Sequence, residues 1–142
     1  MRTPLAACLA ACVTVLAAGA CRAARQAPQP AAVLASAPAG ALRHVVVFRF
    51  KPGTTPEQIR ELTRAFAALR QQIPGIIGFE HGVNDSPEGA NMGFTHVYLL
   101  TFASAAARDA YLPHPAHKAF GELLGRLGIY DGVFVVDYAP AP

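Results

Sequence analysis

The sequence predicts an α+β domain over residues 42–142, with four strands in one antiparallel sheet and the element order β-α-β-β-α-β. Two observations support this. Stretches of alternating apolar residues, which are typical of half-buried strands, recur along the segment. Amphipathic stretches with apolar residues three and four positions apart lie between them and predict helices.

The first strand is predicted over residues 42–51, LRHVVVFRFK, because β-branched and aromatic side chains dominate there. Successive side chains of a strand point to opposite faces of its sheet. One face therefore receives His44, Val46, Phe48 and Phe50, and the other receives Val45, Val47, Arg49 and Lys51.

The first helix is predicted to begin after the turn at Pro52-Gly53. Thr55 and Gln58 have the spacing of a capping box, and Pro56 occupies the favoured first helical position. The helix is expected to end near Pro74 and to bury one stripe, which comprises Ile59, Leu62, Phe66 and Leu69.

The second half repeats the pattern. A strand is predicted over 76–84, and the polar, glycine-containing run after it predicts a turn that leads to a third strand over 94–103. A short helix over 104–112, a longer one over 114–128 and a last strand over 130–138 complete the domain. This order is that of ferredoxin-like domains, whose helices cover one side of the sheet.

The other side of the sheet would expose apolar side chains, for which we expect Val45, Val47, Val133 and Val135. Contiguous apolar surface of this kind marks an interface. A second copy packed sheet to sheet would cover it, so we expect a symmetric homodimer.

Residues 1–21 have the layout of a secretory signal: an early arginine, an apolar run too short to span a membrane comfortably, and small residues before Cys21. Ala18-Gly19-Ala20-Cys21 resembles a bacterial lipoprotein signal, which predicts lipidation of Cys21. Simple cleavage before the same cysteine remains the alternative. Both predict export, to the periplasmic side of a bacterial membrane as a lipoprotein or otherwise as a soluble periplasmic or secreted protein.

Residues 22–41 are rich in alanine and proline and predict a tether of about 25 Å end to end. Three of the 12 basic residues precede residue 42, which leaves nine basic and nine acidic residues in the domain. The domain is therefore formally neutral, and its scattered positive charges argue against nucleic-acid binding. A lipid on Cys21 would be the one membrane contact.

The segment YLPHPAHKAF, residues 111–120, carries the candidate chemistry. His114 and Pro115 have the residue types of a helix start, which places His117 in the first turn of the helix. The positive end of a helix disfavours an imidazolium, so His117 would be neutral and able to act as a base. It shares a helix face with Phe120 and would point toward the core.

Tyr111 and His44 are expected to reach the same cavity. A phenol there could donate to a carbonyl oxygen whose charge grows as His117 removes a neighbouring proton. Three interpretations stay open: a purely structural role, ligand binding without chemistry, and catalysis. No metal site is predicted, because His44, His114 and His117 lack a carboxylate aimed toward them. No cofactor is predicted either, since phosphate-binding glycine loops are absent from the sequence.

Three motifs resemble the stress-responsive dimeric α/β-barrel family, Dabb: LRHVVVFRFK, FTHVYLLTF and YLPHPAHKAF. The resemblance covers almost all of residues 42–139. It implies a ferredoxin-like fold, a dimer with a barrel between the two sheets, and a role in stress response. It does not imply one activity.

The family includes a plant enzyme, olivetolic acid cyclase, which closes a linear polyketide without a cofactor. Its catalytic pair matches His117 and Tyr111, and a pocket histidine matches His44. Thr63 and Ala67 imply a differently shaped pocket. We therefore expect a pocket for a small apolar molecule, with cyclase-like or other lyase or isomerase activity as the alternative; its expected lining is Val46, Phe48, Leu62, Phe66 and Phe120.

Overall fold

The computed structural model describes residues 38–141. Their elements confirm the predicted order, including the short extra helix. The bounds are β1 Leu42–Phe50, α1 Pro56–Gln72, β2 Ile76–Val83, β3 His96–Phe102, α2 Ala105–Tyr111, α3 Pro115–Leu127 and β4 Tyr130–Tyr138.

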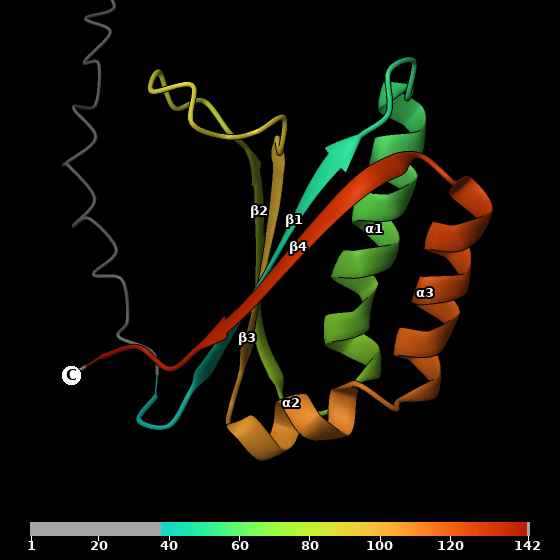
Figure 1. Ribbon diagram of the computed structural model, residues 1–142. Coiled ribbons are helices and arrows are strands. Elements are labelled where there is room, and N and C mark those ends of the chain that lie inside the picture. Colours follow the sequence, from blue (N-terminus) through green and yellow to red (C-terminus); the bar gives the residue numbers. More distant parts are fainter. Residues whose placement is uncertain (1–37, 142) are drawn as a thin grey trace, which may run out of the picture. The chain divides into compact units, whose positions relative to one another are not determined.

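The four strands form one antiparallel sheet in the order β2-β3-β1-β4, so β1 and β3 are central. Figure 1 shows α1 and α3 side by side over one face of this sheet, with α2 near one end of it. None of the described helices lies on the opposite face. The predicted ferredoxin-like fold is confirmed.

The core lies between the sheet and the helices. Alternation along β1 turns His44, Val46 and Phe48 toward the helices, where each is less than a tenth exposed. The stripe predicted for α1 is buried against them, with Leu62, Phe66 and Leu69 at 0–2% exposure. The capping box at Thr55 is also formed as predicted, with both reciprocal bonds to Gln58 present.

The helix-free face of the sheet is apolar, but one part of its prediction was wrong. The register pairs Val133 with Phe48 and Val135 with Val46, which puts Val133 and Val135 on the helix side of the sheet. Paired residues of neighbouring strands point to the same face. The side chains that β4 adds to the open face therefore include Phe134 and Val136, 53% and 37% exposed, and Tyr138.

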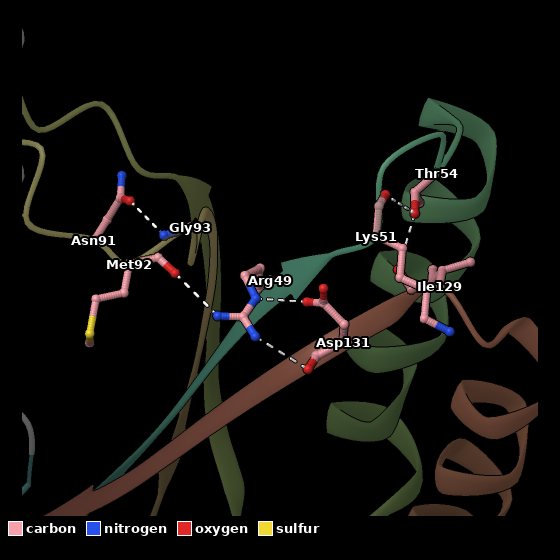
Figure 2. Close-up of polar contacts among 8 residues, drawn as sticks. All are labelled: Arg49, Lys51, Thr54, Asn91, Met92, Gly93, Ile129 and Asp131. Atoms are coloured by element: carbon pink, nitrogen blue, oxygen red, sulfur yellow. Dashed lines mark hydrogen bonds and ion pairs between the residues drawn. The ribbon is translucent and has the colours of Figure 1, made fainter.

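One end of the sheet is tied together by Arg49 of β1 (Figure 2). Its Nε donates to Asp131 Oδ1 at 2.7 Å and its Nη1 to the backbone carbonyl of Met92 at 3.3 Å. The guanidinium also lies 5.2 Å from the centre of the Phe94 ring, a cation–π distance. Arg49 thus links the loop between β2 and β3 to the start of β4.

Close by, Lys51 donates to the carbonyl of Gly128 at 2.7 Å. Gly128 ends α3 in the left-handed conformation, φ +57°, and a lysine on the last carbonyls of a helix is favourable. Thr54 bonds the carbonyls of both Lys51 and Ile129, which joins the end of β1 to the residue before β4 (Figure 2).

The predicted signal over residues 1–21, Cys21 with its predicted lipid, and residues 22–37 of the predicted tether lie outside the described residues. The last residues of that tether are described. Residues 38–41 include a turn just before β1, and Ala41 there is buried, with 1% of its surface exposed. Across residues 38–141, no helix has the length and apolar character needed to cross a membrane.

Candidate functional site

The fold brings His44, Tyr111 and His117 together. They come from β1, from the last residue of α2 and from the first turn of α3. The ring centres of Tyr111 and His117 are 4.1 Å apart, and those of Tyr111 and His44 are 5.7 Å apart at an angle of 64°. Tyr111 is therefore the middle ring of a three-ring cluster at the entrance to α3.

His117 is half-buried, and its Nδ1 lies 3.0 Å from the carbonyl oxygen of Leu112. A carbonyl only accepts hydrogen bonds, so Nδ1 carries a proton, and in the neutral ring Nε2 carries the lone pair. His117 thus has a free basic nitrogen beside the Tyr111 ring.

His114 starts the helix, as predicted. It is the N-cap of α3, and its Nδ1 accepts a hydrogen bond from the amide of Ala116 at 3.1 Å. This bond uses the imidazole lone pair that a metal ion would need. His114 is therefore part of the helix start and not of the ring cluster.

Tyr111 is 1% exposed. Burial raises the pKa of its phenol well above the ordinary value, and the negative charge of Asp137 raises it further. The phenol therefore keeps its proton throughout the neutral range. In the chemistry of the cluster, Tyr111 is a hydrogen-bond donor.

Sequence reasoning missed two residues beside this cluster, Asp137 of β4 and Arg108 of α2. Asp137 Oδ1 lies 2.6 Å from His44 Nδ1, and its second oxygen accepts a hydrogen bond from Arg108. The expectation that no carboxylate is aimed toward the histidines was wrong. The available signal was a lone acid in the otherwise apolar run from Val133 to Tyr138.

The side chains predicted to line a pocket lie in the core and pack against one another. The rings of Phe66 and Phe120 are stacked at 4.6 Å, and the ring of Phe66 lies 5.2 Å from that of Tyr98. The Tyr98 hydroxyl is bonded to Thr63 Oγ1 at 2.8 Å. All five predicted lining residues are at most 8% exposed: Val46, Phe48, Leu62, Phe66 and Phe120.

Of the hollows on the described surface, three well-formed ones are not lined by His44, Tyr111 or His117. One of about 280 Å³ lies on the open sheet face, between Val47, Val97 and Phe134 and the loop after β2. A second of about 240 Å³ runs between α1 and α3 and includes Phe120. Among residues 38–141, no three His, Cys, Asp or Glu side chains are grouped so that they could hold a metal ion.

Two of the similar proteins of known sequence each match about 70% of this chain. The stress-response A/B barrel domain-containing protein HS1 of Arabidopsis thaliana is 39% identical over 101 residues, which is 71% of this chain and 91% of that protein. Olivetolic acid cyclase of Cannabis sativa is 28% identical over 100 residues, or 70% of this chain and 97% of the cyclase.

Solved structures are similar to this chain as well. The hydroxynitrile lyase of Passiflora edulis has a TM-score of 0.64 at 25% identity, covering 71% of this chain and 94% of the lyase. A dimeric ferredoxin-like protein of unknown function from Jannaschia has a TM-score of 0.61 at 31% identity, covering 71% of this chain and all of that one. Residues 42–140 match the model of the Stress responsive A/B Barrel Domain, and the chain therefore belongs to the Dabb family.

Proposed function

We propose that the chain is a homodimeric protein that binds a small, mainly apolar molecule beside His44, Tyr111 and His117. The observation that carries the proposal is the three-ring cluster, in which Tyr111 lies 4.1 Å from one histidine ring and 5.7 Å from the other. Small-molecule binding sites usually combine a small number of polar groups with apolar surroundings.

The cluster supplies complementary polar groups. The Tyr111 phenol donates, and the Nε2 of His117 accepts. The apolar side of the site would come from the core residues next to it, of which Phe120 is one turn after His117 on α3. Such a site suits a ligand with one or two oxygen functions on a hydrocarbon body.

Native mass spectrometry of protein purified from its own host is expected to show a bound small molecule. A second test titrates 4-butylphenol into the full chain and follows binding by calorimetry. Tyr111→Phe is expected to weaken binding about three- to tenfold, because one hydrogen bond is lost. The matched control Tyr138→Phe removes a hydroxyl from the open sheet face and is expected to change nothing. Equal affinities for all three proteins would contradict the proposed site.

A second candidate is proton-transfer catalysis of a lyase or cyclase kind. The free Nε2 of His117 could take a proton from a substrate while the Tyr111 phenol donates to the oxygen that becomes more negative. The likeness to olivetolic acid cyclase and to a hydroxynitrile lyase supports this class of reaction.

Release of benzaldehyde from mandelonitrile is a direct assay for the lyase form of this activity. His117→Gln is expected to abolish turnover and to leave the affinity for 4-butylphenol within about twofold, since glutamine retains hydrogen-bonding groups but is not a base. His81→Gln, on β2, is the matched control. Absence of turnover in the unmodified protein would leave binding alone as the proposed function.

The homodimer is proposed from the open face of the sheet, where partly exposed valine, leucine and phenylalanine side chains gather and no helix within residues 38–141 covers them. The similar Jannaschia protein, which is described as dimeric, supports it. The residues of this face are Val45, Val47, Val97, Leu99, Phe134 and Val136.

Sedimentation of the full chain tests the dimer. Phe134→Glu places a charge on the open face and is expected to shift the protein toward monomer at micromolar concentration. Leu112→Glu changes a similarly exposed apolar residue at the end of α2 and is expected to leave the dimer intact. A monomeric unmodified protein would refute the proposal.

We also propose, from the residue pattern of positions 1–21 alone, that the protein is exported and that Cys21 carries a lipid. The domain would then be held near a membrane face by its tether.

A further inference from the structure

Asp137 and Arg108 form a chain of contacts behind His44 that the proposed binding role does not use. Asp137 lies directly opposite His44 in the β1–β4 register. One carboxylate oxygen is 2.6 Å from His44 Nδ1, and the other accepts a hydrogen bond from Arg108. These contacts thus connect α2 to β4 and β4 to β1.

This geometry determines which nitrogen of His44 carries the proton. A neutral imidazole has one N–H and one lone pair, and an ionised carboxylate only accepts hydrogen bonds. Asp137 therefore requires the proton on Nδ1 of His44. Nε2, across the ring from Asp137, is left as an acceptor within a side chain that is 8% exposed.

Arg108 keeps Asp137 in this role. The guanidinium has donors only and stays charged, so it donates to the second oxygen of the carboxylate and holds it in place. Its Nε also donates to Asp109 at 2.8 Å. Arg108 is three residues before Tyr111 on α2, so the contact that orients His44 also ties the Tyr111 helix to β4.

We propose that Asp137 is a positioning residue that fixes His44 as the Nδ1–H tautomer, and that Arg108 holds Asp137 in place. The cluster then has a second acceptor, His44 Nε2, beside the acceptor His117 Nε2 and the donor Tyr111. If the cluster binds a ligand as proposed above, the acceptor on His44 favours ligands that carry a hydroxyl group over ligands whose oxygens only accept hydrogen bonds. This preference rests on the proposed binding function. The tautomer itself does not depend on that function.

The test of the tautomer is ¹⁵N NMR of the histidine rings in the full chain, with the His44 signals assigned by their loss in His44→Gln. The unmodified protein is expected to show a protonated Nδ1 and an unprotonated Nε2. A protonated Nε2 and an unprotonated Nδ1 on His44 of the unmodified protein would overturn the proposal.

Asp137→Asn provides a sharper test. Arg108 can only bond the amide oxygen, which turns the NH₂ group toward His44 Nδ1 and is expected to move the ring proton to Nε2. Asp109→Asn makes the same change in the other carboxylate bonded to Arg108 and is expected to leave the His44 tautomer unchanged. An unchanged tautomer in Asp137→Asn would overturn the proposal.

The ligand preference is measured with 4-butylphenol and its methyl ether, 4-butylanisole. The unmodified protein is expected to bind the phenol about three- to tenfold more tightly, and Asp137→Asn is expected to reduce this difference, because His44 Nε2 no longer accepts while His117 Nε2 still does. Equal binding of both probes by the unmodified protein would refute the preference. If neither probe binds but the tautomer is as expected, the proposed binding function fails and the positioning role of Asp137 stands.

Discussion

Gly75 provides the clearest quantitative test of how the structure positions Tyr111. It lies between α1 and β2 with φ +91°, a backbone conformation that side chains disfavour. A Cβ at this position would be 2.6 Å from the Cβ of Ala107 in α2. Because α2 ends at Tyr111, a methyl group at Gly75 would push on the helix that carries the middle ring of the cluster.

The cost of Gly75→Ala has two parts. A left-handed conformation costs an ordinary residue about 1–2 kcal/mol. Forcing a methyl group into occupied space costs about 1–3 kcal/mol more. The matched control is Gly53→Ala, where φ is +83° but no atom lies within 4 Å of the added methyl, so that only the first part applies.

Urea unfolding at one protein concentration measures these free energies, since the stability of an oligomer depends on concentration. Gly75→Ala is expected to lose about 1–3 kcal/mol more than Gly53→Ala. Ala107→Gly costs about 1 kcal/mol of helix propensity by itself. Combined with Gly75→Ala it removes the clash, so the double variant is expected to lose about 1–3 kcal/mol less than the sum of its parts.

Two results would refute this reasoning. One is a loss in Gly75→Ala no larger than that in Gly53→Ala, which would mean that α2 yields without cost. The other is a double variant whose loss equals the sum of the two single losses, which would mean that Gly75 and Ala107 do not interact.

Further predictions concern the first helix, acid stability and the N-terminal segment. Thr55→Ala removes the N-cap of α1 and is expected to lower the free energy of unfolding by about 1 kcal/mol; a loss below a few tenths would show that the capping box contributes little. Burial lowers the pKa of His96, and the nearby His81 lowers it further. The unfolded chain therefore binds more protons than the folded chain below about pH 6.5, so stability is fully present above that pH and falls as the pH drops toward the lowered pKa. Urea unfolding of His96→Gln is expected to show a weaker loss in acid than the unmodified protein, and an unchanged pH profile would contradict this. Cys21→Ala is expected to abolish incorporation of labelled fatty acid and to release the protein from membranes into the soluble fraction; labelling that persists in this variant would exclude lipidation at Cys21.

Much of the fold follows from residues close together in the chain. The capping box at Thr55, the buried stripe of α1 and the helix start at His114 depend on contacts within about four residues, and each was found from spacing alone. The inward face of β1 was predictable for a similar reason, because its outward positions include Arg43 and Arg49 and so mark the wetter side.

The last strand shows where this reasoning fails. From Val133 to Val136 every side chain is apolar, so alternation divides the strand into two sets without indicating which set faces the helices. Only the register with β1 decides that Phe134 and Val136 belong to the open face. The prediction for Val133 and Val135 was wrong for this reason.

The candidate site also has one part that the sequence predicted and one part that it did not. The sequence by itself determined the element order, the helix starts and the three ring residues His44, Tyr111 and His117, because local patterns and motif spacing carry that information. Only the tertiary structure placed Asp137 against His44, 93 residues away, and Arg108 against Asp137. A cross-strand contact depends on the register of strands distant in sequence, and that register is set by packing of the whole sheet, which local residue patterns do not contain.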